Sequence, residues 1–373
     1  MLQLDRGELV KRLVKIVLIE LLIILILLSF LIYKWDIFDI ASKKAFFIKS
    51  QVQTREISVK GSKLYVELEK ALLETKDQLE LRDLSLLKKP QEIFNILEMI
   101  SNDKPEIMYY RGAEYRFGKL KLLYTKSKEE IEEHRERIRA IREDFISNYI
   151  KEDMTDYEKL LVTHDYIVNN SRYDDRLFHD SMLPPESYSS YGVLALGIGV
   201  CEGYAKAMKY ILDDLGMRSI IVVGESMGEN HAWNLVELDG DYYHIDSTWD
   251  DPVTDNGKDI LRYNYFNLDD ESLSKTHRWD KDDYPRANGR IYNYFTYNNL
   301  LVSSSIELEQ KLREAILKKA TGLSLKFEGF DGQTQLNNMI ETIAYDNYEI
   351  IRLKGYSYSI DDEHEIISFE FYY

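Results

Sequence analysis

The chain has 373 residues, enough for two or three domains of ordinary size. Its composition, 45% hydrophobic and 30% charged, is ordinary for a globular protein, and its formal net charge is −17. A negative charge of this size argues against a phosphate-binding surface, so nucleic acid is not an expected partner. The 28 tyrosines favour a fold with β-structure, in which amphipathic rings fill the core and the sheet edges.

An apolar run near the N-terminus, residues 16–33, is interrupted only by Glu20 and Ser29. As a helix it would span roughly 27 Å, close to the thickness of a hydrocarbon core. Basic residues precede the run, so the tail of residues 1–15 is expected to stay in the cytoplasm. We therefore expect a single-pass anchor in the cell membrane that holds the rest of the chain outside the cytoplasm. A cleaved signal peptide is the alternative, although no clear small-x-small cleavage site precedes Ser42.

Two stretches on either side of the middle of the chain are expected to form small α/β modules. In residues 43–124 the pattern predicts helices at 63–76 and 90–101 and extended segments at 53–59, 79–84, 106–110 and 115–124. Residues 298–373 show the same order, with helices at 306–319 and 333–344 and extended segments at 300–304, 323–327, 349–358 and 365–371. We interpret them as diverged copies of one module, with chance similarity as the alternative. Neither holds a cluster of catalytic residue types, so we expect scaffolds or arms that present substrate.

A charged segment leads into the central domain. Residues 125–154 are expected to form a helical linker with a solvated surface. Thr155 and Glu158 then form a capping box that opens a second helix. His164 lies on the apolar face of that helix and is expected to be a core histidine rather than a ligand. We place the central domain at residues 155–290.

Cys201 is the only cysteine of the chain, and it begins a predicted helix. A lone cysteine forms neither an internal disulfide nor a thiolate-rich metal site. Apolar residues recur at helical spacing from Cys201 to Leu215, and Gly216 ends the pattern. Free N–H groups in the first turn of a helix stabilise a thiolate over a thiol. Of the two remaining roles, inert buried thiol and nucleophile, this position favours the nucleophile.

A predicted hairpin follows the cysteine helix. Asp239 and Gly240 form a preferred two-residue turn between two strands. The register of that turn places Thr248 opposite His231. It also places Asp246 one diagonal step from His231, about 7–8 Å away at the backbone, which is close enough for an imidazole and a carboxylate to meet.

Cys201, His231 and Asp246 are the residue types that nucleophilic catalysis needs. His231 would remove the thiol proton and later return a proton to the leaving group. Asp246 would accept from the other imidazole nitrogen and fix the orientation of the ring. The alternative is a buried thiol, a hairpin histidine and a strand-end aspartate with no shared role. His244 is a less suitable base because it lies on the same strand as Asp246, two residues away.

Three motifs in this region resemble those of the bacterial transglutaminase-like superfamily. They are residues 199–205 (GVCEGYA), 230–234 (NHAWN) and 243–252 (YHIDSTWDDP). The resemblance covers about residues 155–285 and implies an α+β, papain-like fold, in which the helix that bears the cysteine packs on an antiparallel sheet. It also implies a catalytic triad of Cys201, His231 and Asp246. The superfamily includes crosslinking enzymes, peptidases, amidases and inactive members, so the reaction stays open.

One feature of papain-like enzymes is not accounted for. These enzymes use a side chain upstream of the cysteine, often Gln or Trp, to bind the oxyanion, and neither type occurs in residues 92–199. The backbone N–H of Cys201 can serve as one donor. We take Tyr188, Tyr191 and Trp233 as the candidates for a second donor or a substrate contact.

Four acidic residues after the third motif invite a comparison with calcium sites. They lack the spacing of an EF-hand, and a solvated acidic loop is the better interpretation of Asp250, Asp251, Asp255 and Asp259. We expect neither a metal nor a cofactor.

These observations favour a membrane-anchored, extracytoplasmic cysteine enzyme. It would transfer or hydrolyse amide-linked acyl groups of envelope protein or peptide through a thioester on Cys201. The alternative is a catalytically weak or inactive surface module that binds a protein or cell-wall partner, an idea motivated by the incomplete oxyanion hole. A purely structural spacer is least favoured because it needs no ordered Cys-His-Asp set. The acyl donor, the acyl acceptor and the oligomeric state are not predicted.

Overall fold

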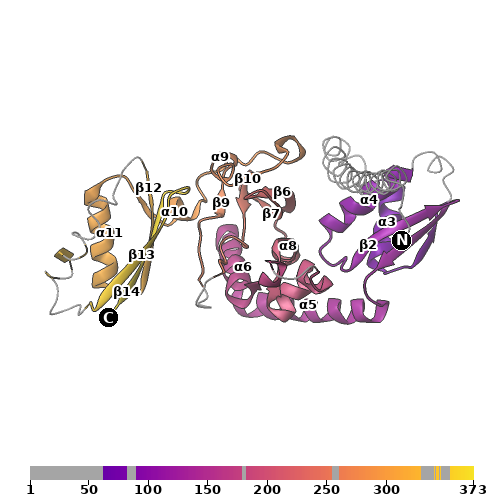
Figure 1. The fold of residues 1–373 in the computed structure, drawn as a ribbon, viewed down its shortest axis with the longest axis horizontal. Coiled ribbons are helices and arrows are strands. Elements are labelled where there is room, and N and C mark those ends of the chain that lie inside the picture. The colour runs from indigo at the N-terminus through magenta and orange to yellow at the C-terminus, as the bar shows by residue number, and fades with distance from the viewer. Residues whose placement is uncertain are drawn as a thin grey trace, which may run out of the picture. The chain divides into compact units, whose positions relative to one another are not determined.

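The computed structural model describes residues 62–81, 90–178, 182–253, 260–328, 340, 342, 343, 345 and 353–373 (Figure 1). All of them belong to the unit Val59–Tyr373. The predicted tail at 1–15, anchor at 16–33 and strand at 53–59 lie outside the described residues. Among the described residues, no helix combines the length and the apolar character that crossing a membrane requires.

The first described module is a small sheet covered by two helices. Its elements are α3 (Lys63–Leu73), β1 (Gln78–Glu80), α4 (Pro90–Asp103), β2 (Tyr110–Arg116) and β3 (Lys119–Tyr124). The strands pair antiparallel in the order β1-β3-β2. Amphipathic helix faces supply Leu68, Leu97 and Ile100, which pack with Leu120 of the sheet in one buried cluster.

The predicted strands at 106–110 and 115–124 are wrong in their boundaries. The chain turns at Phe117 and Gly118, which have φ angles of +50° and +80°. Two consecutive left-handed residues make the tight turn that matches the twist of a hairpin. Phenylalanine is an uncommon residue at such a position, so the turn was hidden inside what looked like one strand.

Helix α5 (Lys128–Tyr149) leads from this module into the central domain. Ser127 caps it in a capping box with Glu130. The sequence has an apolar stripe here, at Ile131, Ile138, Ile141, Phe145 and Tyr149. The interpretation of the helix as a solvated strut is wrong along that stripe, because Ile131, Ile138 and Phe145 are fully buried.

The central domain combines helices with a five-stranded antiparallel sheet. Its elements before the sheet are α6 (Asp156–Asn170), β4 (Arg172–Tyr173), η2 (Asp175–Phe178), η3 (Pro185–Tyr188), α7 (Ser190–Leu196), β5 (Ile198–Gly199) and α8 (Cys201–Asp214). The sheet consists of β6 (Ser219–Ser226), β7 (Glu229–Leu238), β8 (Asp241–Ile245), β9 (Phe266–Leu268) and β10 (His277–Arg278) in the order β10-β6-β7-β8-β9. The remaining short helices are α9 (Asp270–Leu273), η4 (Lys281–Asp283) and α10 (Tyr294–Tyr297).

Helix α8 packs its apolar stripe on this sheet. Tyr204, Met208 and Ile211 are buried in one cluster with Val236 and Phe266 of the strands. Each such side chain contributes roughly 1.5–3 kcal/mol when it leaves water. The predicted arrangement, a cysteine-bearing helix on an antiparallel sheet, is therefore present.

The predicted hairpin register is confirmed for the strands that form it. Asn234 pairs with Ile245, and Leu238 pairs with Asp241. Asp239 and Gly240 have φ angles of +52° and +88°, as a turn of this type requires.

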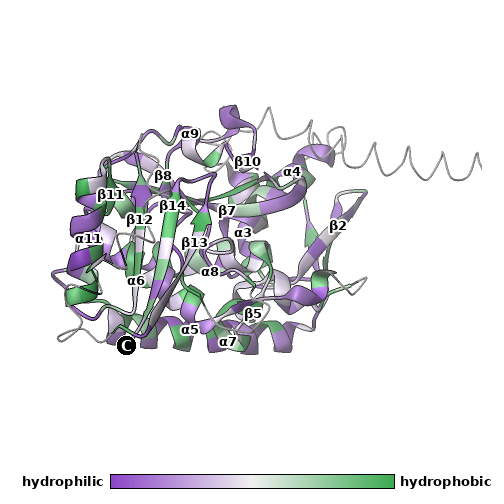
Figure 2. Cartoon of the chain, turned by 60° about the vertical axis from the view of Figure 1, so that its left-hand side comes forward, coloured by the Kyte–Doolittle hydropathy of each residue, from purple (hydrophilic) through white to green (hydrophobic). Residues whose placement is uncertain are grey.

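The last module resembles the first in its topology. Its elements are β11 (Leu301–Val302), α11 (Ser305–Leu317), β12 (Gly322–Phe327), β13 (Gly355–Asp361) and β14 (Ile366–Tyr372), with strand order β11-β12-β14-β13. Figure 2 shows the largely hydrophobic β14, whose Phe369 and Phe371 are buried. The antiparallel order β12-β14-β13 equals β1-β3-β2. The duplication stays a prediction, and its helix at 333–344 lies mostly outside the described residues.

Candidate active site

Cys201 is the first residue of α8 and is partly buried. Val200 at the N-cap provides no side-chain hydrogen bond to the first turn, so no side chain of the cap competes for its N–H groups. Close packing explains the glycines around the cysteine. A Cβ on Gly203 would lie 2.7 Å from the carbonyl oxygen of Ser187, and one on Gly199 would lie 2.5 Å from a methyl of Val193. The start of α8 therefore packs directly against η3 and α7.

His231 and Asp246 form the short polar contact that the sequence predicted. Nε2 of His231 lies 2.6 Å from Oδ2 of Asp246. The Cys201 side chain lies close enough to the same imidazole for the two groups to interact electrostatically. Because Asp246 occupies Nε2, Nδ1 is the ring nitrogen left for the sulfur. The structure thus brings the three predicted triad residues together.

The way in which Asp246 reaches His231 differs from the prediction. The strand pairing of β8 with β7 stops at Ile245, so Thr248 is not paired with His231. On the opposite edge of β7, His231 pairs with Gly224 of β6. The chain bends away after β8, and the amide of Asp246 donates to the carbonyl of Tyr265. The carboxylate consequently lies beyond the sheet and is held by its own hydrogen bonds.

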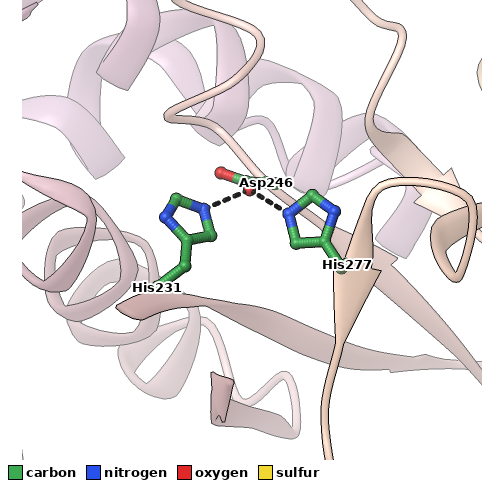
Figure 3. A group of neighbouring side chains, drawn as sticks. All are labelled: His231, Asp246 and His277. Carbon is green, nitrogen blue, oxygen red and sulfur yellow. Dashed lines mark hydrogen bonds and ion pairs between the residues drawn. The ribbon is translucent and has the colours of Figure 1, made fainter. Parts of the chain in front are cut away.

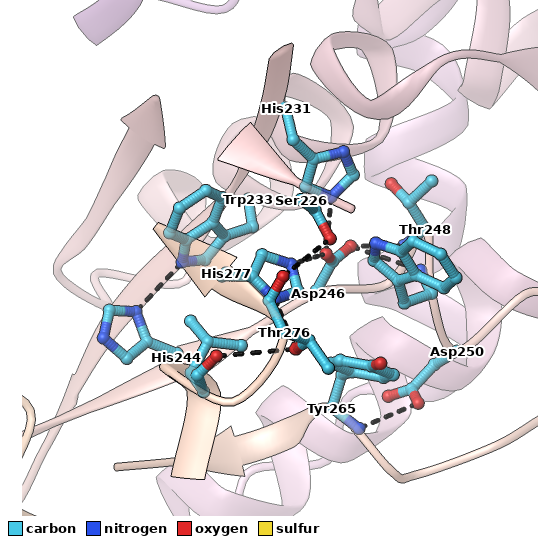
Figure 4. Close-up of polar contacts among 12 residues, drawn as sticks. Ser226, His231, Trp233, His244, Asp246, Thr248, Asp250, Tyr265, Thr276 and His277 are labelled. Carbon is cyan, nitrogen blue, oxygen red and sulfur yellow. Dashed lines mark hydrogen bonds and ion pairs between the residues drawn. The ribbon is translucent and has the colours of Figure 1, made fainter. Parts of the chain in front are cut away.

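Four hydrogen bonds hold the Asp246 carboxylate. Its Oδ1 accepts from the backbone N–H groups of Thr248 at 3.0 Å and Trp249 at 3.2 Å. Its Oδ2 accepts from His231 and also from Nε2 of His277 at 3.0 Å (Figures 3 and 4). A carboxylate with this many donors is stabilised in its ionised form.

The charges of the pair reinforce each other. Burial opposes the charged form of His231, but the charge and hydrogen bond of Asp246, together with Cys201, outweigh it and raise the pKa of His231 to about 10. Burial alone would raise the pKa of Asp246, but the charge and hydrogen bond of His231 and the hydrogen bond of His277 hold it well below its usual range. The resting form is therefore an imidazolium–carboxylate pair across neutral pH.

This pair predicts a specific pH dependence. A histidine with a raised pKa stabilises the fold fully below its unfolded pKa of 6.5 and loses that contribution as the pH rises through about 10. We expect NMR of the His231 ring to show a proton lost near pH 10, with the free energy of unfolding falling over the same window. In Asp246→Asn the ring should titrate below 6.5, because burial remains and the charge is gone. A wild-type ring that titrates near 6.5 would contradict the pairing.

His277 is a site residue that the sequence did not reveal. His231, Asp246 and His277 each offer one atom that could bind a metal ion, and these three atoms lie within 4.8 Å of one another. The contacts of 2.6 and 3.0 Å are hydrogen-bond lengths, and each nitrogen already points at the same oxygen. The sequence showed only a histidine before Arg278 and Trp279, with nothing to connect it to Asp246.

The same region matches a known family. Residues 143–247 match the family model of the Transglutaminase-like superfamily. The chain contains a transglutaminase-like domain. The match includes Cys201, His231 and Asp246, and it confirms the resemblance inferred from the motifs.

Similar solved structures share little sequence with the chain. One is described as a TGase, with 19% identity over 33% of this chain and 34% of that chain and a TM-score of 0.28. Another is a candidate cysteine protease from Cytophaga hutchinsonii, with 19% identity over 33% of this chain and 41% of that chain and a TM-score of 0.26. Menin, whose structure reveals a binding site for the MLL protein, has 15% identity over 76% of this chain and 51% of that chain, at a TM-score of 0.25. No curated protein sequence matches the chain.

Trp233 and His244 are hydrogen-bonded to each other inside the transglutaminase-like domain. The single N–H of the Trp233 indole donates to Nδ1 of His244 at 3.0 Å, and the side chain is 1% exposed. Trp233 as an oxyanion donor or substrate contact is therefore wrong. His244 in turn contacts Asp270 through Nε2 at 2.9 Å, so it is a structural histidine and not the base.

The two candidate tyrosines of the domain have different neighbours. The ring of Tyr191 stacks on His134 of α5 at 3.6 Å between centroids, and nothing in the described residues connects it to Cys201. Tyr188 is 37% exposed and close enough to Cys201 for their charges to interact.

Tyr173 is a further residue beside the cysteine that the sequence did not reveal. It ends β4, pairs with Gly199 of β5 and so lies two residues across from Cys201. Burial and then the charges of Cys201 and Tyr188 raise the pKa of Tyr173 to about 12. Its hydroxyl therefore keeps its proton at neutral pH and can act as a hydrogen-bond donor. The sequence offered Tyr188 and Tyr191 but not Tyr173, because no local pattern reports the pairing of β4 with β5.

His164 is a buried core histidine, as expected. His164 is fully buried, with Nε2 3.1 Å from Asp250 and Nδ1 3.2 Å from Asp165. The expectation of a solvated acidic loop is wrong for Asp250 and Asp251, which are buried. The hydroxyl of Tyr204 donates to Asp251. These aspartates anchor the loop after β8 to α6 and α8, while Asp255 and Asp259 lie outside the described residues.

Proposed function

We propose that this protein is a cysteine acyltransferase or hydrolase that acts on amide bonds of protein or peptide. One observation carries the proposal: His231 is hydrogen-bonded to Asp246 and interacts electrostatically with Cys201, and all three residues belong to a transglutaminase-like domain. A buried thiol without a function would need neither the imidazole nor a carboxylate aligned behind it.

The first half of the reaction forms a thioester. The proton of the Cys201 thiol resides on His231 as the imidazolium, and the thiolate sulfur attacks the amide carbonyl carbon. The negative oxygen of the tetrahedral intermediate accepts hydrogen bonds from the Cys201 backbone N–H and the Tyr173 hydroxyl. The C–N bond then breaks, and His231 gives its proton to the departing nitrogen. Asp246 stays ionised and holds the imidazolium.

The second half resolves the thioester. His231 removes a proton from water or from an amine, which attacks the acyl carbon. The C–S bond breaks, and the sulfur leaves as a thiolate while His231 keeps the proton, which restores the resting state. Water gives a free carboxylate, and an amine gives a new amide that crosslinks two chains. Tyr188 is partly exposed and interacts electrostatically with Cys201, which makes it our candidate for a substrate contact.

The location outside the cytoplasm is part of the proposal. It is supported by the apolar run at 16–33 and the basic residues before it. Envelope protein or peptide is then the substrate class, with the cell wall as a further partner. Protease added to intact cells should degrade the domain while a cytoplasmic marker survives. Protection of the domain in intact cells would contradict the location.

A generic transfer assay tests the reaction. Purified protein is incubated with dimethylated casein and a dansyl amine, and amine incorporation and ammonia release are followed together. Incorporation that depends on Cys201 indicates transfer, and ammonia release without incorporation indicates hydrolysis. If Cys201→Ala keeps both partner binding and the phenotype, the result would instead support the non-catalytic surface module.

The oxyanion role of Tyr173 gives a separate prediction. Tyr173→Phe keeps the ring and removes the donor, so kcat should fall by about 10²–10³-fold, the usual effect of losing one oxyanion donor. The melting temperature and the alkylation rate of Cys201 should stay near those of the wild type. Tyr191→Phe, on the stacked ring, is the matched control and should retain activity. Equal kcat values for the two variants would contradict the assignment.

A further inference from the structure

Asp246 lies in a place where the sheet does not fix it. Strand β8 ends at Ile245, and the carboxylate projects beyond the last residue paired with β7. Only its hydrogen bonds determine which oxygen faces His231. Two of them come from the backbone of the turn that follows, at Thr248 and Trp249, and both reach Oδ1. Besides His231, the donor that reaches Oδ2 comes from a different strand, at His277.

His277 is held rigidly for this contact. It lies on the edge strand β10, where it pairs with Ser226 of β6. Its side chain is fully buried, edge-on to the Trp233 ring at 4.9 Å and to the Tyr265 ring at 5.7 Å. The ring therefore has no alternative partner in solvent for its Nε2–H.

The other ring nitrogen fixes the tautomer. Nδ1 of His277 lies 2.8 Å from the hydroxyl of Thr276, which can donate to it (Figure 4). A neutral imidazole that accepts at Nδ1 carries its proton on Nε2, the nitrogen that faces Asp246. Thr276 thus donates to His277, and both His277 and His231 donate to Oδ2 of Asp246.

Burial, with a smaller contribution from the positive charge of His231, keeps this ring neutral. The titratable groups that face it are Asp246, His231, His364 and Tyr265. Burial lowers the pKa of His277 and outweighs the hydrogen bond to Asp246, which acts in the opposite direction. Two positive rings on one carboxylate would repel each other. A neutral His277 ring instead adds a hydrogen bond to Asp246, and the negative charge of Asp246 is left to pair with His231.

We propose that His277 is a positioning residue, whose neutral Nε2–H holds the Asp246 carboxylate in the orientation that receives His231. Its consequence for turnover rests on the proposed function, whereas the hydrogen bond itself does not. Metal sites offer a parallel. Residues that hydrogen-bond to a metal ligand orient that ligand, and their loss lowers activity although they never touch the substrate.

Three variants separate this role from simple packing. His277→Leu keeps the volume and removes the donor, so kcat should fall about 10–100-fold with little change in KM, as expected for one hydrogen bond to a charged group. His277→Gln keeps an N–H near the position of Nε2 and should recover most of that loss. Thr276→Val leaves the ring in place and frees its tautomer, and it should show a smaller loss. Kinetic losses that follow the melting temperature, with no rescue by glutamine, would overturn the proposal.

A spectroscopic readout works even if the protein is not an enzyme. The proton in the short His231–Asp246 hydrogen bond should give a low-field NMR resonance in the wild type. It should broaden or shift in His277→Leu and return in His277→Gln. An unchanged resonance in His277→Leu would overturn the proposal, whatever the assays of turnover show. Stoichiometric zinc in the purified wild type, absent from His277→Leu, would also overturn it, because the metal would then occupy Nε2.

Discussion

Replacing Cys201 with alanine is expected to abolish turnover, with a loss on the order of 10⁴-fold or more. The reason is chemical: the thioester needs the sulfur, and no second cysteine exists in the chain to replace it. The side chain is small and partly buried at the start of α8, so the fold should tolerate the change. The measurement is kcat in the amine-incorporation or ammonia-release assay, together with the melting temperature.

A matched control makes this result specific. Met227 lies at the turn between β6 and β7 and is 58% exposed, so Met227→Ala should retain full activity. Residual turnover of Cys201→Ala within about tenfold of the wild type would show that another group performs the chemistry, because covalent catalysis cannot survive loss of its nucleophile.

Replacing Asp246 with asparagine is expected to have the second largest effect. It should lower kcat by about 10⁴-fold, because an amide neither stabilises the imidazolium nor enforces the tautomer of His231. It should also lower the free energy of unfolding by about 3–5 kcal/mol, since a buried charge pair loses one member. Denaturant unfolding and kcat are measured on the same preparation.

The neighbouring pair of His164 and Asp250 supplies the control for Asp246. Asp250 is equally buried and contacts His164 at 3.1 Å. Asp250→Asn should therefore lower stability while leaving kcat within about tenfold of the wild type. A similar loss of kcat in the two variants would mean that Asp246 acts only through the fold.

The elements that the sequence predicted well were set by local chemistry. Asp239 and Gly240 favour the left-handed backbone of a two-residue turn, and both have positive φ. The position of this turn determines which residues of β7 and β8 pair. The helix from Cys201 followed from its apolar spacing and from Gly216, whose φ is +71°. The turn and the helix end each depend on a few neighbouring residues, so a single sequence predicts them.

The features that the sequence missed depend on long-range packing. His277 reaches Asp246 only because a two-residue strand, β10, pairs with the edge of β6. Tyr173 approaches Cys201 only because β4 pairs in parallel with β5. Trp233 looked like a site residue from its motif, yet its N–H is donated to His244. No local periodicity reports such pairings.

The alkylation rate of Cys201 as a function of pH tests the central claim most directly. Iodoacetamide modification is followed by mass spectrometry in the wild type, in His231→Asn and in a free cysteine derivative. If Cys201 is the nucleophile of a triad, the wild type should react rapidly at pH 6–7, and His231→Asn should lose most of that rate. A wild-type thiol that reacts only above about pH 8.5, like a free cysteine, would contradict the account.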